Sequence, residues 1–480
     1  MDSVRPDHLS LYGYRRKTSP HLDRFSREAT VYDFSISPSS FTAAVMPSLF
    51  LSLYPTDHYL RFGYPPPIFL RRNTFWFLQL LKTSNVQTAA FTCNFLTSRY
   101  GLVGFEEYFD HFDDAIYSPV SEQPFFRSTQ DVLPNVISWI EKNKKKNFFL
   151  WLHLMDTHGP YVPSVRPLFP VLSYDEDRLL HRIIYSYTGV SLEKQESDSR
   201  LQGIPHFQLQ GVHVSPNGEI EDFERRESYY VSKYDTAIHV LDSALGNFFS
   251  YLRSTDFYRN CQIIVHSDHG EAMGEFGFYF SHGIGITPDQ IHVPLLIKDP
   301  RIEVGHRSVA VSLLDIVPTI LGYFSLPFSQ TIRGFDLKDS HRSHELLFSI
   351  APMGISVFVG SRLYCFHCGT VDRNYRTSLK LFKLDPKDEF IKPFQRDQYY
   401  LSVYEKVDNL FRRISSKLIP SYLFQTLKSF VDNHNQTFDH FTLDSGRWHQ
   451  RLRSKHRKQI ADLLMRHVKY RHEQSIHHPE

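Results

Sequence analysis

Apolar residues recur along the chain at two different spacings. In residues 230–252 they fall at helical intervals, as at Ala237, Leu241 and Leu245, and residues 134–142 repeat this pattern over a shorter stretch. Both segments are predicted to be amphipathic helices. Continuous apolar runs predict buried strands over residues 88–93, 147–154 and 261–265. Because helices and strands alternate, we expect a three-layer α/β domain with a mixed, mostly parallel sheet.

Other segments complete the expected organisation. A helix is predicted over residues 75–83, and another begins at or just after Thr42, with Pro47 in its first turns, where proline is tolerated. The polar, aperiodic residues 172–226 indicate an insertion. We therefore expect a main domain over residues 1–340.

The pattern of apolar and polar residues changes after residue 340. Residues 357–366 and 378–384 are predicted to be strands of a small antiparallel β subdomain over residues 341–400. Residues 401–480 are expected to form a basic tail, helical from Tyr404 on. Between Arg447 and Arg471 this tail holds nine Lys or Arg residues and one acidic residue. A solvated helix face explains these charges, and contact with anionic lipid or a polyanion is the alternative.

Composition narrows the class of protein. The chain has 480 residues, of which 41% are apolar and 22% charged, which suits a large folded core. A net charge of +2 gives no overall basic field, so nucleic acid is not an expected partner. No apolar run approaches the ~20 residues of a membrane span. Four cysteines are too few for a disulfide-dense scaffold.

Potential metal ligands follow two of the predicted strands. Asp268 and His269 follow one strand, Asp156 and His158 follow another, and His282 lies in a glycine-rich loop shortly downstream. Ligands bind beyond the carboxyl ends of strands in open α/β sheets. A carboxylate and imidazole set suits Zn²⁺ or Mn²⁺. For any one of these residues, a surface histidine or a helix-capping aspartate is the simpler interpretation.

Several motifs occur in a fixed order along the chain. They are Met1 to Tyr14 with Thr18 to Asp23, Leu152 to Tyr161, Tyr234 to Leu245, Ser267 to Glu271 with His282-Gly283 and His292 to Leu295, and Asp315 to Thr319. In this order they resemble the sulfatase-like branch of the alkaline phosphatase superfamily. The resemblance spans about residues 1–340. It implies an alkaline phosphatase-like fold and a metal-dependent enzyme acting on phosphate or sulfate esters.

The resemblance also implies roles for individual residues. Asp2 matches a metal-binding carboxylate, and Asp268 and His269 match two further ligands of the same metal. His158 and His282 match residues that bind the transferring group or a second metal. The implied cofactor is a divalent metal, with zinc favoured and manganese or calcium as alternatives.

The nucleophile position departs from the sulfatase pattern. Sulfatases carry a Cys-x-Pro-x-Arg-type motif whose first residue becomes formylglycine, and this chain has Thr42 and Met46 at the Cys and Arg positions. Threonine cannot become formylglycine. Residues 42–50 instead resemble the threonine nucleophile motif of phosphoethanolamine transferases. Thr42 is therefore expected to be a catalytic, metal-bound nucleophile that forms a phospho-threonine; the alternative is a plain helix N-cap.

Three functions remain open on these grounds. The leading hypothesis is a hydrolase or transferase acting on a phosphate ester or phosphodiester of a lipid or glycan. The second is a sulfuric ester hydrolase that works without formylglycine, and the third is a catalytically impaired relic that binds anionic sugars or lipids.

The beginning of the sequence affects fold and location. Members of the resembled family place an apolar strand just before the residue that matches Asp2, and here only Met1 precedes it. We expect a lost upstream segment, which would also allow an extracytoplasmic or membrane-associated location. If Met1 is the true start, a cytoplasmic location follows, and Asp2 is expected to fray and bind metal less tightly.

Overall fold

The computed structural model describes most of the first 368 residues and two later strands. The described residues are 1–58, 75–99, 106–115, 127–161, 166–181, 183–184, 204–205, 208–217, 220–274, 279–283, 285–328, 332–340, 342–344, 347–351, 354–359, 362–368, 399–407 and 410–419. Among these residues, no helix has the length and apolarity needed to cross a membrane.

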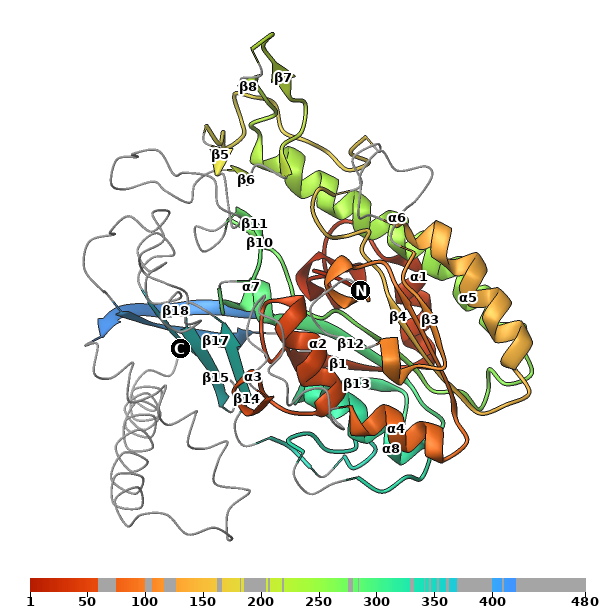
Figure 1. Cartoon of the computed structure of the whole chain (residues 1–480). Helices are drawn as coiled ribbons and strands as arrows, with labels where there is room; N and C mark the ends of the chain where they lie inside the picture. The colour runs from red at the N-terminus through yellow and green to blue at the C-terminus, as the bar shows by residue number, and fades with distance from the viewer. Residues whose placement is uncertain are drawn as a thin grey trace.

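Two sheets form the middle layer of the main domain (Figure 1). A four-stranded sheet has the order β13-β1-β12-β9, and a three-stranded sheet has the order β3-β2-β4. The strands of the first are β1 (Thr30–Ile36), β9 (Ile263–His266), β12 (His292–Lys298) and β13 (Gly305–Ser312). Those of the second are β2 (Gln87–Thr92), β3 (His111–Asp113) and β4 (Phe148–His153). Only β12 runs antiparallel to its neighbours, so the mixed, mostly parallel arrangement is confirmed.

Helices cover both faces of this layer. One apolar core lies between the sheets and helices α1 (Pro20–Phe25), α5 (Thr129–Asn143) and α6 (Glu227–Arg253). The other lies against α2 (Thr42–Leu51), α4 (Trp76–Thr83) and α8 (Ile316–Tyr323). Helices α2, α4, α5 and α6 and strands β2, β4 and β9 all form where the hydrophobic pattern predicts them. The expected α/β architecture is therefore confirmed.

The predicted insertion contains little regular structure in its described part. Short strands β5 (Ile183–Ile184) and β6 (Ile204–Pro205) pair with each other, as do β7 (His213–Val214) and β8 (Ile220–Asp222). Figure 1 shows β7 and β8 projecting beyond the amino end of α6. Strand β6 also contacts β11 (Tyr279–Ser281), which pairs with β10 (Ala272–Met273). The described part of the main domain also contains two short α-helices, α3 (Pro55–His58) and α7 (Pro288–Ile291).

A separate antiparallel sheet follows the main domain. Its strands, in spatial order, are β14 (Leu347–Ala351), β15 (Gly354–Val359), β16 (Arg362–Cys368), β17 (Tyr399–Val407) and β18 (Leu410–Ile419). The expected antiparallel sheet is present, but two predictions about it were wrong. The single strand predicted over residues 357–366 is two strands, β15 and β16, paired with each other.

The second error concerns the start of the tail. Residues 404–407 and 410–419 are strand where helix was predicted. Their tyrosine, valine and isoleucine residues favour strands, and pairing of β17 with β16 decides the matter. The predicted strand over residues 378–384 and the tail beyond residue 419 lie outside the described residues.

One buried carboxylate joins α1 to α6. Asp242 of α6 accepts hydrogen bonds from the backbone N–H groups of His21 and Leu22, both at 2.8 Å. These groups belong to the first turn of α1, where backbone donors have no partner within the helix. Burial raises the pKa of Asp242 to about 6.

We predict that Asp242→Ala destabilises the main domain. The two N–H groups of α1 lose their acceptor, so the free energy of unfolding should fall by about 1–3 kcal/mol. Urea denaturation measures this change. Lys17→Ala, an exposed side chain near α1, is the control and should change stability by no more than about 0.5 kcal/mol. Equal stability of the two variants would contradict this role for Asp242.

Candidate active site

Thr42 is the first residue of helix α2, directly after the loop that follows β1. Its N-cap is Phe41, and no side chain caps the helix, so the alternative of Thr42 as an N-cap is wrong. The Thr42 hydroxyl instead lies 3.1 Å from Nε2 of His269 and 3.5 Å from a carboxylate oxygen of Asp2. The first amide that bonds within the helix is that of Ala44. The N–H groups of Thr42 and Ala43 therefore lie at the open, positive end of α2.

Asp2 is fully buried between β4 and β9. Its backbone N–H donates to the Leu154 carbonyl at 2.9 Å. Asp2 is therefore held in place, and the expectation that it frays if Met1 is the true start was wrong. Its carboxylate accepts 2.8 Å hydrogen bonds from Ser3 Oγ and Asn94 Nδ2. Burial raises the pKa of Asp2, but the nearby imidazoles of His153, His158 and His269 outweigh burial, so the pKa lies well below its ordinary value. Asp2 is thus a fixed negative charge.

Asp268 and His269 enter the site from the loop that follows β9. Oδ1 of Asp268 accepts hydrogen bonds from the backbone N–H groups of Ser3 and His269. The other oxygen, Oδ2, is buried without a hydrogen-bond partner. His269 Nδ1 lies 2.9 Å from the carbonyl of Gly270. Because a carbonyl only accepts, Nδ1 holds a proton, and Nε2 faces Thr42 and the two carboxylates.

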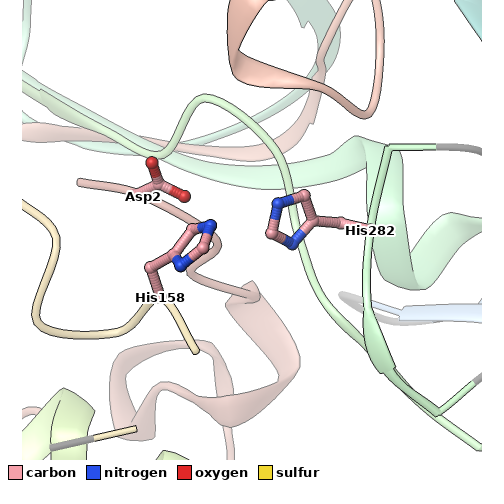
Figure 2. A group of neighbouring side chains, drawn as sticks. All are labelled: Asp2, His158 and His282. Atoms are coloured by element: carbon pink, nitrogen blue, oxygen red, sulfur yellow. The ribbon is translucent and has the colours of Figure 1, made fainter. Parts of the chain in front are cut away.

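His158 and His282 form the other side of the site. Figure 2 shows both imidazoles turned toward Asp2 from separate loops, and their ring centroids are 5.0 Å apart. Nδ1 of His158 lies 2.8 Å from the carbonyl of Gly159, and Nδ1 of His282 lies 3.1 Å from Glu271 Oε2. Each ring is therefore oriented by a partner outside the cluster.

Burial shifts the pKa values of Glu271 and His282. It raises the pKa of Glu271 to about 8. Burial, followed by the neighbouring His269 and His158, lowers the pKa of His282 well below its ordinary value. At neutral pH Glu271 therefore holds a proton beside a neutral His282. Glu271, buried beside His282, therefore supports a histidine of the site.

The arrangement fits a divalent cation. Ligand atoms of Asp2, Asp268 and His269 lie within 4.8 Å of one another, and so do those of Asp2, His158 and His282. The carboxylates of Asp2 and Asp268 are both buried and close together, and one Asp268 oxygen lacks a hydrogen-bond partner, so a positive charge between them would stabilise the pair. Asp2 belongs to both groups, so its carboxylate is the centre of the site.

The structure brings together six of the predicted site residues: Asp2, Thr42, His158, Asp268, His269 and His282. Asp156, the seventh, is not among them: this carboxylate accepts hydrogen bonds from the backbone and hydroxyl of Thr129 at the start of α5. Asp156 was grouped with His158 because both follow β4, but it anchors a helix instead.

Two residues of the site were missed by sequence reasoning. Asn94, after β2, donates to Asp2 while its Oδ1 accepts the N–H of Leu96, which fixes the orientation of its amide. His153, the last residue of β4, places Nε2 at 3.4 Å from Asp2 and 3.9 Å from Asp268. The sequence feature that could have indicated both residues is their position at the carboxyl ends of buried strands.

We predict that Asn94→Ala weakens binding of divalent metal. Without the amide, the Asp2 carboxylate loses the contact that orients it, and metal affinity should fall by about 10–100-fold. Competition with a chromophoric chelator measures this affinity. The matched control is Asn143→Ala, whose amide donates to a carbonyl of α5 away from the site. Equal affinity in both variants would show that Asn94 does not position Asp2.

Sequence comparison relates most of this chain to a known family. The sulfatase family model matches residues 1–326. Human arylsulfatase K is 33% identical over 211 residues, which is 42% of this chain and 37% of the relative. The chicken arylsulfatase K is 34% identical over 212 residues, 43% of this chain and 38% of the relative. The match thus spans well under half the length of these curated relatives.

Solved structures share the fold at low identity. A sulfatase structure from Bacteroides thetaiotaomicron has a TM-score of 0.55 at 13% identity, covering 76% of this chain and 81% of the other. The lipoteichoic acid synthase LtaP from Listeria monocytogenes has a TM-score of 0.52 at 16% identity, covering 87% and 86%. These likenesses show the α/β fold, and the family model, which covers more than half of the chain, shows that this protein belongs to the sulfatase family.

Proposed function

We propose that this protein is a metal-dependent hydrolase or transferase that acts on a phosphate ester or phosphodiester through a covalent phospho-Thr42. The observation that carries the proposal is the position of the Thr42 hydroxyl, 3.1 Å from His269 and 3.5 Å from Asp2, at the start of α2. A buried hydroxyl among metal-ligating groups, with no capping role, is the arrangement of a nucleophile.

The cation would be held by Asp2, Asp268 and His269, with Thr42 beside them. A divalent metal bound there would lower the pKa of a hydroxyl in contact with it and so favour the alkoxide at neutral pH. The imidazole and carboxylate ligands favour zinc, and manganese or calcium are the alternatives.

The residues of the chain account for the remaining chemistry. Thr42 Oγ loses its proton to water and attacks phosphorus, and the bond from phosphorus to the ester oxygen breaks. His158 and His282 face the transferring group and stabilise its oxygens, and the open amide groups at the start of α2 add further donors. The departing alkoxide takes a proton from water. Water or an acceptor alcohol then removes the phosphoryl group from Thr42 and regenerates the hydroxyl.

We predict that Thr42→Ala lowers phosphoesterase turnover by about a thousandfold or more, because no other group replaces the nucleophile. Thr42→Ser, which keeps a hydroxyl, should retain measurable turnover. Acid quenching during turnover, followed by peptide mass spectrometry, should find phosphate on Thr42. Thr83→Ala, on the exposed surface of α4, is the matched control. An unchanged rate in Thr42→Ala with the fold intact would end the proposal.

The relatives favour a second candidate, a sulfuric ester hydrolase that works without formylglycine. Arylsulfatase K is among the curated relatives, and its name describes sulfate-ester cleavage. Against this stands Thr42, since threonine cannot form the aldehyde hydrate that sulfatases use. The same metal and imidazole groups would serve either ester.

Parallel assays of aryl phosphate, aryl phosphodiester and aryl sulfate separate the two candidates. We expect kcat/KM to be at least about tenfold higher for a phosphorus ester than for the sulfate. The opposite order, abolished by Thr42→Ala, would establish the sulfatase reaction instead. Turnover of none of the three esters, together with no bound divalent metal, would favour the binding relic.

A further inference from the structure

The insertion reaches the active site through the side chain of Gln208. This residue comes shortly after β6 and is 1% exposed, although it belongs to a segment whose polar, aperiodic sequence predicted only an insertion. Strand β6 contacts β11, and His282 directly follows β11. The insertion therefore packs beside one of the two histidines that face Asp2 in Figure 2. We call His158 and His282 the imidazole pair.

The first contact of Gln208 is with the strand that leads to His282. Its Nε2 donates to the carbonyl of Phe280 at 3.1 Å. Phe280 has a φ of 48°, in the left-handed region that residues with a side chain seldom adopt. Such a backbone persists only where its surroundings hold it. Here the Gln208 amide holds the carbonyl of Phe280, and Tyr230 stacks on the ring with a centroid separation of 4.8 Å.

The second contact of Gln208 is with the loop of His158. A Cβ atom on Gly159 would collide with Nε2 and Cδ of Gln208, so the amide rests directly on the Cα atom of this glycine. The carbonyl of Gly159 in turn lies 2.8 Å from Nδ1 of His158 and orients that ring. A side chain at residue 159 would displace the amide.

We propose that Gln208 is a positioning residue of the active site, because its amide contacts the backbone beside both members of the imidazole pair. It ties the loop of His158 to the strand that precedes His282. This tie sets the spacing of the two rings, whose centroids are 5.0 Å apart. The consequence for catalysis rests on the proposed function, in which the pair stabilises the phosphoryl oxygens.

The spacing matters because both rings serve one small tetrahedral group. Two groups stabilise the same phosphoryl oxygens only where both reach them in the correct geometry, and fixing that geometry in advance is a large part of what a site contributes to the reaction. Gln208 acts through the two histidines, so it is not assigned a catalytic role.

Other contacts already hold the backbone around Gln208. The N–H of Gln210 donates to the Tyr230 hydroxyl at 3.2 Å, and its carbonyl accepts the N–H of Glu224 at 2.8 Å. Ile204 of β6 is buried in the core beside α5 and α6. Removing the Gln208 side chain should therefore affect the imidazole pair more than it affects the folding of the insertion.

The test uses the full chain and removes the contact from each side. Gln208→Ala deletes the amide, Gly159→Ala displaces it, and the double variant makes room for the added methyl group. The matched control is Gln262→Ala, whose amide donates to Asp299 at 2.6 Å near the other end of β9. Amide hydrogen exchange is measured by mass spectrometry on peptides covering residues 155–161 and 279–283.

We expect exchange in both stretches to become at least about tenfold faster in Gln208→Ala and in Gly159→Ala, and not in the control. The double variant should exchange no faster than Gln208→Ala, because both changes remove the same contact. If Gln208→Ala does not fold, Gln208→Met replaces it in the comparison with the control, since methionine keeps the length of the side chain but not the donor.

A binding measurement separates positioning from a structural role. Calorimetry follows inorganic phosphate binding to the zinc-loaded chain, and competition with a chelator follows zinc. We expect Gln208→Ala to weaken phosphate binding by about tenfold or more and zinc binding by less than about threefold. The reason is that the amide lies beside His158 and His282, whereas Asp2, Asp268 and His269 are the proposed zinc ligands.

Three results would overturn the proposal. They are equal exchange in Gln208→Ala and the control, phosphate affinity that is unchanged or falls only as far as zinc affinity, and no phosphate binding by the unaltered chain. The proposed reaction is judged separately. Phosphate affinity that depends on Gln208 in a chain that forms no phospho-Thr42 would reject the reaction and keep this inference, and phospho-Thr42 with equal phosphate affinities would do the reverse.

Discussion

The buried carboxylate of Asp2 is the constraint on which the rest of the site depends. It accepts hydrogen bonds from Ser3 and Asn94 and belongs to both groups of candidate metal ligands. A charge that is removed from water is tolerated only where partners surround it. Thr42 and His269 supply that environment on one side, and His158 and His282 on the other. Moving Asp2 would therefore disturb the candidate nucleophile and the candidate phosphoryl-binding groups together.

The same residue connects the chemistry to the fold. Met1, directly before Asp2, donates its nitrogen to the His266 carbonyl of β9, and the N–H of Asp2 donates to the carbonyl of Leu154, directly after β4. Because Asn94 and His153 lie at the ends of β2 and β4, the three-stranded sheet holds the other side of the carboxylate.

Much of the fold was predictable because its signals are local. The apolar spacing of α6 and the continuous apolar runs of β2 and β4 depend only on residues near in sequence. The start of the tail was mispredicted because β17 and β18 are strands by virtue of pairing with one another and with β16, and such pairing is not a local property.

For the site, the sequence by itself determined which residue types are present and in what order, and this was enough to predict Thr42, Asp268 and His269. Only the tertiary structure decided which polar groups meet. It placed Asn94 and His153 against Asp2 and turned Asp156 toward α5. Hydrogen bonds between buried groups link segments far apart in the chain, such as Asn94 and Asp2, and neither segment carries a local pattern that reveals the other.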